Sequence, residues 1–245
     1  EAVKQLAGIV TEADAVMVAR GDLGIEVHLE ELPVVQRRIV AECARIGRKV
    51  IVATHMLESM VENPVPTRAE VTDVANAVFE QADAIMLSGE TSVGRYPVKC
   101  VETLDRIARR IERETVPGYS ETLELKSEKE QLVRSAVLLA HSLERASLLV
   151  FTARGVLANL AANLRPGRAP IFAFSPDAAV VRSLVMNRAV LPVRFDLDED
   201  PVENTRRALA YLREKGLVEA GDPVVIVSDV LLPGFDNGAV LLRHA

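Results

Sequence analysis

The sequence has no tryptophan, two cysteines and few aromatic residues, which make up 4% of its 245 positions. Cys43 and Cys100 lie far apart, and each falls in a segment whose pattern predicts a helix. Such a pair gives neither a disulfide framework nor the ligand spacing of a zinc site. Sparse cysteine is typical of a reducing compartment, so we expect a cytoplasmic protein with both thiols in its core.

The sequence also lacks an excess of positive charge and any long hydrophobic run. Its 29 Lys and Arg residues stand against 35 Asp and Glu, for a formal net charge of -6. Nucleic acids and anionic membrane surfaces are bound by basic patches, and a membrane-spanning helix needs about 20 apolar residues in succession. We therefore expect neither a nucleic acid nor a membrane among the partners. Hydrophobic residues still make up 49% of the chain, enough for a globular core.

The first half of the chain reads as alternating strands and helices. Short apolar runs, typical of parallel strands covered on both faces, occur at residues 14–19, 49–53 and 84–87. Helical patterns occur at residues 32–46, 67–81 and 97–114. Thr67, with Glu70 three residues on, predicts a capping box. The strands recur about every 35 residues, the length of a βα repeat. Three strands would leave two unpaired edges, so either further strands belong to this sheet or the region packs in another way.

The second half shows a similar alternation after a polar stretch. Residues 117–129 contain Pro, Gly and mixed charges, which predicts a linker between a first domain at 1–116 and a second at 130–245. Predicted strands lie at 148–152, 170–174, 190–195, 223–228 and 239–243, and predicted helices at 130–144, 156–164, 178–186 and 202–215. This order predicts an open, mostly parallel α/β sandwich with helices on both faces.

Polar residues follow each strand of the first half: Arg20-Gly21-Asp22, Thr54-His55 and Ser88-Gly89-Glu90. Ligands of α/β barrels and open α/β sheets bind beyond the carboxyl ends of the strands. Asp22 offers the hard oxygen that Mg²⁺ prefers, and Gly21 allows close approach to backbone amides. Thr54 offers a hydroxyl, and Ser88 and Glu90 could relay a proton. One Asp-Gly pair is more often a turn, but three such ends in register predict a site.

Three longer stretches carry a family signal: MVARGDLGIEV at 17–27, VIVATHMLESM at 50–60 and NPVPTRAEVTDVANAVFEQADAIMLSGETSVGRYPV at 63–98. They closely resemble the latter part of pyruvate kinase. The second half resembles the family's carboxy-terminal domain more weakly, through its strand order and the closing loop at 228–238. The resemblance implies the last three βα units of a TIM (β/α)₈ barrel followed by an open, mostly parallel α/β sandwich domain.

The resemblance further implies that the first part of the barrel and the lid domain are absent from this chain. Absent with them would be the catalytic lysine and a second metal-binding glutamate of the family. The chain opens at Glu1 without Met or a signal peptide, which reads as a start in mid-domain. We expect the 245 residues by themselves to be inactive on phosphoenolpyruvate.

The activity implied is Mg²⁺-dependent phosphoryl transfer from phosphoenolpyruvate to ADP, giving pyruvate and ATP in glycolysis. The family also implies Mg²⁺ or Mn²⁺, K⁺, and a homotetramer. Carried over by position, Asp22 would hold the metal, and the amides of Gly21 and Asp22 would cradle the substrate carboxylate. Thr54 would donate to that carboxylate from the opposite side. Ser88 and Glu90 match residues proposed for the proton path to the enolate.

Two segments depart from the family pattern. His55 stands where the family usually has Gln; it either tunes the site or is a tolerated replacement. The effector loop of the family is rich in Thr, Ser and Gly, whereas residues 151–160 read FTARGVLANL. Thr152, Arg154 and Gly155 at this helix start could bind a phosphate effector, or the segment is a plain strand-to-helix turn.

Two other functions compete with a working pyruvate kinase. An aldolase-like barrel that handles pyruvate also uses a strand-end Asp and Mg²⁺, but would lack the TRAEVTDVANAV helix and the second domain. A truncated, non-catalytic relative could bind a ligand or partner through the surviving domain. The intact strand-end residues argue against that reading, because a decayed site need not keep them.

Overall fold

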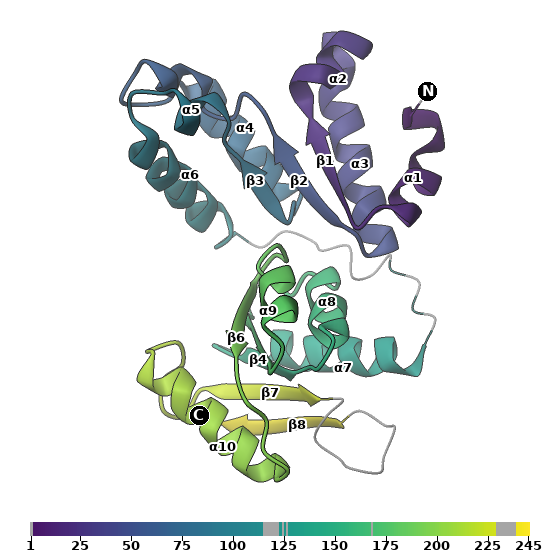
Figure 1. Ribbon diagram of the computed structural model, residues 1–245, viewed down its shortest axis with the longest axis vertical. Coiled ribbons are helices and arrows are strands. Elements are labelled where there is room, and N and C mark those ends of the chain that lie inside the picture. The colour runs from purple at the N-terminus through teal and green to yellow at the C-terminus, as the bar shows by residue number, and fades with distance from the viewer. Residues whose placement is uncertain (1, 115–122, 124, 126, 168, 229–238) are drawn as a thin grey trace. The chain divides into compact units, whose positions relative to one another are not determined.

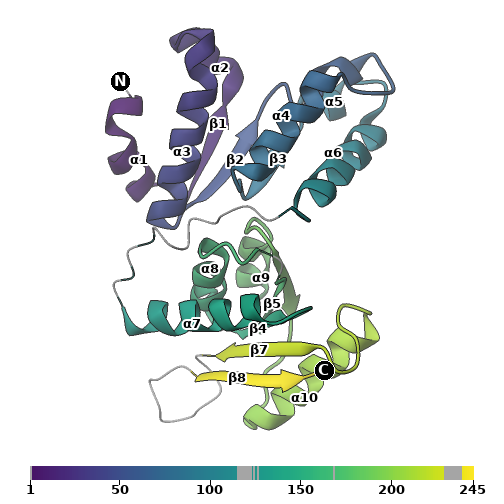
Figure 2. The same ribbon diagram turned by 180° about the vertical axis from the view of Figure 1, so that it is seen from behind.

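The computed structural model describes residues 2–114, 123, 125, 127–167, 169–228 and 239–245. The chain divides into two compact units, residues 1–119 and 120–245 (Figures 1 and 2). The predicted linker at 117–129 and the closing loop at 228–238 lie largely outside the described residues. Within the described ranges, no helix is both long and apolar enough to cross a membrane.

The first unit is built on a parallel sheet of three strands in the order β1-β2-β3. The strands are β1 (Ala15–Ala19), β2 (Lys49–Ala53) and β3 (Ala84–Met86), which confirms the three predicted strands. Ala19 is level with Ala53, and Ala53 with Met86, so all three strands end at the same edge of the sheet. Among the described residues, β1 and β3 each pair along one side.

The helices of the first unit include three that the sequence predicts and three shorter ones. The predicted ones are α3 (Leu32–Ile46), α4 (Arg68–Phe79) and α6 (Pro97–Ile111). The shorter ones are α1 (Leu6–Glu12), α2 (Arg20–Glu26) and α5 (Gly89–Ser92). Single turns of 3₁₀ helix lie at Ala2–Gln5, Leu29–Glu31 and Glu58–Val61. Helix α3 packs on β1 and β2, α1 packs on α3, and α4 packs on α6 (Figure 1).

Local sequence signals explain where these helices begin and end. Thr67 Oγ1 accepts from the Glu70 N–H at 3.3 Å, and Glu70 Oε2 accepts from the Thr67 N–H at 2.7 Å, which confirms the predicted capping box. Gly47 ends α3 with φ of 80°, a left-handed conformation that glycine adopts without steric cost. Cys43 and Cys100 are both buried, as the sequence predicts.

The second unit is a five-stranded sheet in the order β6-β5-β4-β7-β8. Its strands are β4 (Ser147–Phe151), β5 (Ile171–Ser175), β6 (Val190–Arg194), β7 (Pro223–Ser228) and β8 (Ala239–His244). All neighbours are parallel except β7 and β8. The open, mostly parallel sheet is therefore confirmed.

Helices cover both faces of this second sheet. They are α7 (Glu128–Ser142), α8 (Val156–Asn163), α9 (Ala178–Leu184) and α10 (Pro201–Glu214). Helices α7, α8 and α9 share one core with β4, β5 and β7, built mainly from Ala, Val and Leu. Helix α10 packs on the opposite face, against a cluster of Phe151, Phe174 and Phe195. The unit is thus a three-layer α/β sandwich.

Candidate active site at the strand ends of the first unit

The carboxyl ends of β1 and β2 meet through Gly21 and Thr54. The Gly21 N–H donates to Thr54 Oγ1 at 2.9 Å, and the Thr54 hydroxyl donates in turn to the Ala53 carbonyl at 2.7 Å. A Cβ at Gly21 would lie 3.4 Å from His55 Cε1 and 3.8 Å from Thr54 Oγ1. The structure therefore brings together Gly21 and Thr54, the two residues predicted to bind one substrate group. Because Gly21 has no side chain, its amide can be approached closely.

The Arg20-Gly21-Asp22 segment is the first turn of helix α2, rather than the simple turn that adjacent Gly and Asp residues would favour. Asp22 is exposed there, and its carboxylate lies in the first turn of the helix, where the helix dipole favours negative charge. Among the residues that the structure describes, no group of three or more His, Cys, Asp or Glu could hold a metal ion alone. Mg²⁺ is commonly held by one or two carboxylates with substrate oxygens and water, so Asp22 fits as one such ligand.

The turn after β2 has an unusual backbone. Thr54 and His55 have φ of 68° and 53°, so two consecutive residues with side chains adopt the left-handed region. Such residues cost about 1–3 kcal/mol each and persist where surrounding contacts hold them. The turn therefore depends on its neighbours.

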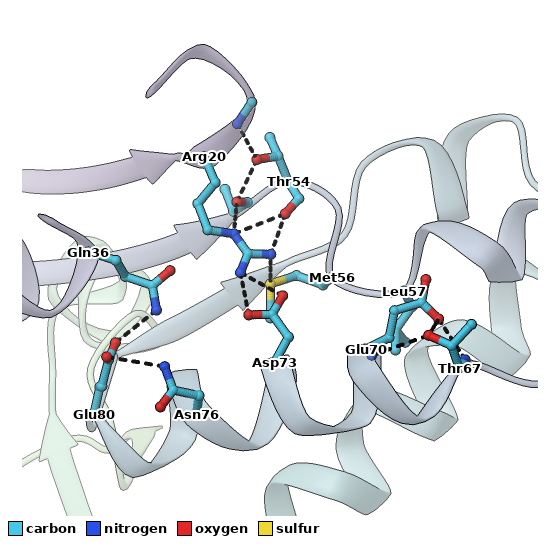
Figure 3. Close-up of polar contacts among 12 residues, drawn as sticks. Arg20, Gln36, Thr54, Met56, Leu57, Thr67, Glu70, Asp73, Asn76 and Glu80 are labelled. Atoms are coloured by element: carbon cyan, nitrogen blue, oxygen red, sulfur yellow. Dashed lines mark hydrogen bonds and ion pairs between the residues drawn. The ribbon is translucent and has the colours of Figure 1, made fainter. Parts of the chain in front are cut away.

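Arg20 supplies most of those contacts from the end of β1 (Figure 3). Its Nε donates to the carbonyls of Ala53 and Thr54 at 3.1 and 3.2 Å, and Nη2 donates to the Thr54 carbonyl at 2.5 Å. Nη2 also lies 2.8 Å from Met56 Sδ. Arg20 is 8% exposed, so its guanidinium is directed inward onto the turn after β2.

Asp73 on α4 completes the environment of this arginine. Arg20 Nη1 lies 2.6 Å from both carboxylate oxygens of Asp73, and the pair joins the end of β1 to the helix between β2 and β3 (Figure 3). A hydrogen bond between two charged groups is stronger than one between neutral groups. The sequence places Arg20 at a strand end and favours hydrogen bonding by Asp73 near the mouth of the site. It does not predict that the two residues contact each other or that Arg20 holds the turn of Thr54.

Glu90, which follows β3, is the third strand-end residue with buried contacts. It is 0% exposed, and each carboxylate oxygen accepts a backbone N–H: Oε1 from Leu57 at 3.0 Å and Oε2 from Ser88 at 2.8 Å. Burial and the nearby Glu90 raise the pKa of the Cys100 thiol. Ser88 is partly exposed and precedes α5. The Glu90 carboxylate thus connects the turn after β2, through Leu57, to the turn after β3, through Ser88.

Further hydrogen bonds secure the start and the end of α4 (Figure 3). Burial raises the pKa of Glu70, but hydrogen bonds from Ser59 and Thr67 outweigh this effect, so the pKa lies below its ordinary value. At the other end, Glu80 accepts from Gln36 Nε2 at 2.8 Å and from Asn76 Nδ2 at 3.2 Å. Helix α4, which carries Asp73, is therefore held at both ends.

The predicted effector residues lie in the second unit, between β4 and α8. Thr152 is fully buried, and its Oγ1 accepts from the Gly155 N–H at 3.0 Å. Gly155 has φ of 79°, and a Cβ there would lie 3.2 Å from Val180 Cγ1. Arg154 is exposed. Thr152 and Gly155 therefore serve the local turn, and phosphate binding by the three residues stays a prediction.

Each of the two units matches a known protein family model. Residues 1–101 match the model of the pyruvate kinase barrel domain, and residues 130–237 match that of the pyruvate kinase alpha/beta domain. Pyruvate kinase isozyme A, chloroplastic, of Nicotiana tabacum is 39% identical over 240 residues, which cover 94% of this chain and 40% of that protein. The pyruvate kinase of Methylorubrum extorquens is 39% identical over 244 residues, covering 97% of this chain and 51% of that protein.

A solved structure gives the same result in three dimensions. The crystal structure of a pyruvate kinase from Cryptosporidium parvum matches with a TM-score of 0.89 at 32% identity, over 99% of this chain and 49% of that one. The chain thus spans about half or less of the length of these relatives. The first unit is the last three βα units of the family's barrel, and the second is its α/β domain. Both family models together cover most of the sequence, so this chain belongs to the pyruvate kinase family.

Proposed function

We propose that the protein containing this chain is a pyruvate kinase, which transfers the phosphoryl group of phosphoenolpyruvate to ADP and releases pyruvate and ATP. The observation that carries the proposal is the meeting of Gly21 and Thr54 beside Asp22, within a chain of this family. The domains would be residues 1–116 and 130–245, joined by a linker at 117–129. The whole reaction belongs to the complete protein, because the chain spans about half of its relatives.

The substrate carboxylate would bind where Gly21 and Thr54 meet. In the free site the Gly21 N–H donates to Thr54 Oγ1, so a carboxylate oxygen would replace Thr54 as its acceptor. The Thr54 hydroxyl, which donates to its neighbour's carbonyl, would turn toward the same carboxylate. Two donors from different strands would then fix one end of the substrate, and positioning of this kind supplies much of the catalysis in phosphoryl transfer.

Asp22 would hold a divalent cation, Mg²⁺ or Mn²⁺. The ion, when bound, would neutralise charge on the migrating phosphoryl group. Transfer leaves an enolate of pyruvate that must gain a proton at carbon. The proton path would pass Ser88, which is partly exposed at the same sheet edge and whose backbone N–H donates to Glu90.

Other properties of the family are proposed for the complete protein. They are a requirement for K⁺, a homotetramer, a cytoplasmic location, and a phosphate effector at Thr152, Arg154 and Gly155. The exposed Arg154 beside the first turn of α8 supports the last of these. The relatives include proteins named as chloroplastic, so a plastid is the alternative location to test.

The test is ADP-dependent release of pyruvate from phosphoenolpyruvate by the complete protein. We expect turnover that requires a divalent cation, and we expect Asp22→Asn to reduce kcat/KM by about 100-fold or more, as loss of a metal ligand does. Asp105→Asn, which changes an exposed carboxylate on α6, is the matched control. A folded complete protein that binds phosphoenolpyruvate without turnover would instead support a non-catalytic relative.

A further inference from the structure

The turn after β2 is held at both ends by buried residues of opposite charge, which follow the neighbouring strands β1 and β3. Arg20 binds its first half, and Glu90 binds the amide of Leu57 at its end. We propose that Arg20 and Glu90 are positioning residues, and that Glu90 acts through its two backbone hydrogen bonds rather than by carrying a proton. The inference rests on the proposed function, since it assigns how Thr54 and Ser88 are held for that reaction.

The arginine end fixes the conformation of Thr54. Three guanidinium contacts go to the carbonyls of Ala53 and Thr54, and one to Met56 Sδ. The planar fork of arginine can satisfy these acceptors and Asp73 together, which a lysine ammonium cannot do in the same geometry. The Thr54 carbonyl is therefore held on the arginine side, and its hydroxyl stays directed at Gly21.

The glutamate end fixes Leu57 and Ser88 together. Each oxygen of Glu90 accepts one backbone N–H, and both Glu90 and Leu57 are 0% exposed. A proton relay must exchange its proton with the substrate or with water. This carboxylate is enclosed, and its observed partners are two main-chain amides, which are far too weakly acidic to pass a proton to it. The geometry is that of a brace between two turns.

The two ends together explain why the left-handed pair persists. Two consecutive non-glycine residues with positive φ would relax toward commoner backbone regions if the Thr54 carbonyl and the Leu57 amide, two residues beyond the pair, were released. Relaxation would move Thr54 Oγ1 away from the Gly21 N–H, which lies on a different strand end. Loss of the Glu90 carboxylate would also free the Ser88 amide. The donors to the substrate carboxylate and the residue of the proton path would then be displaced together.

Two variants of Glu90 separate a brace from a proton relay. Glu90→Gln keeps the size but places an amide NH₂ against one backbone N–H, and Glu90→Asp keeps the acid but is too short to reach both amides. A brace predicts that both variants lower phosphoryl transfer and the exchange of pyruvate methyl hydrogens with D₂O by a similar factor. The expected loss is about 10-fold or more, because a hydrogen bond to a charged group is lost. The pH profile should keep its shape.

A relay predicts a different pattern. Glu90→Gln would then abolish the D₂O exchange while phosphoryl transfer persisted, and Glu90→Asp would retain much of both; this pattern would overturn the proposal. Arg20→Lys extends the test to the other end. A loss of phosphoryl transfer in Arg20→Lys similar to that in Glu90→Gln supports positioning. Full activity with lysine would show that charge alone suffices, and would overturn the positioning role of Arg20.

Hydrogen exchange at the Gly21 amide tests the positioning without turnover. In the complete protein we expect this amide to exchange about 10-fold faster or more in Glu90→Gln, Glu90→Asp and Arg20→Lys, because its acceptor is displaced. Asp105→Asn, which changes an exposed carboxylate on α6 outside this hydrogen-bond network, is the control and should leave the Gly21 amide unchanged. An inactive wild type with this exchange pattern would reject the proposed function and keep the positioning. Unchanged Gly21 exchange in all three folded variants would reject the positioning, whatever the activity.

Discussion

Arg20 and Asp73 form an ion pair across 53 positions of sequence, with Nη1 2.6 Å from each carboxylate oxygen. The arginine side chain is 9% exposed and the aspartate side chain 35%, so the pair lies at the margin of the core. Removing one partner of a buried pair leaves the other charge without compensation. Asp73 therefore supports the turn after β2 indirectly, through the arginine that contacts it.

We expect Asp73→Asn to reduce the free energy of unfolding by about 2 kcal/mol, less than for a fully buried pair because Asp73 reaches solvent. The control is Asp105→Asn, which breaks an ion pair with Arg109. The side chain of Arg109 is 73% exposed and that of Asp105 is 55% exposed. That change should cost about 0.5 kcal/mol or less. Urea titrations of both variants provide the measurement. Equal effects would mean that Asp73 contributes no more than a surface charge.

His55→Gly should be more stable than His55→Ala by about 1 kcal/mol, because φ of 53° costs an alanine strain that glycine does not have. Both changes remove the same imidazole, so the comparison isolates the backbone. Thermal unfolding of the two variants would measure the difference. An alanine variant as stable as the glycine variant would show that the left-handed conformation is not maintained.

Gly155→Ala should destabilise the second unit by about 1–3 kcal/mol, through its φ of +79° and a Cβ placed 3.2 Å from Val180. Gly216→Ala has a similar φ of +65° with nothing within 4 Å of the added Cβ, and serves as the control. The excess loss at Gly155 measures the steric part alone. Identical losses, determined by urea unfolding, would leave only backbone strain.

Glu70→Gln should cost about 1–2 kcal/mol at pH 7, because one carboxylate receives hydrogen bonds from both Ser59 and Thr67. The pKa of Glu70 is lowered from its ordinary value of 4.5, so its stabilisation is present above that pH. It is lost as the pH falls through the lowered pKa of the folded state. The gap between wild type and variant should therefore narrow below about pH 4.5. A gap that stayed constant down to pH 2 would contradict the assignment.

The strands and longer helices could be predicted from the sequence because their signals are local. Continuous apolar runs marked β1, β2 and β3, and a glycine marked the end of α3. Helix α7 begins at Glu128 rather than at residue 130, since Ser127 and Glu130 form a capping box. That signature was present in the sequence and would have placed the boundary correctly.

The short helices and the framework of the site could not be predicted in this way. Helix α2 has seven residues, too few for a repeating pattern of apolar residues to mark it as a helix. Gly21 and Gly24 also disfavour a helix. The left-handed Thr54–His55 pair contains no glycine to signal it. Arg20 finds its acceptors through tertiary contacts with segments more than 30 positions away. Such contacts follow from the packing of three strand ends, which no local pattern encodes.

The bond between the Gly21 N–H and Thr54 Oγ1 sets a limit on what any inhibitor can gain at this point. An acceptor that docks there exchanges one hydrogen bond for another, so the number of bonds is conserved and the net gain in affinity is small. Selectivity is affected more than affinity, because a compound that displaces Thr54 without offering an acceptor leaves the Gly21 amide unsatisfied. Fragments with a planar carboxylate should therefore be favoured over apolar ones of equal size, even though neither binds tightly.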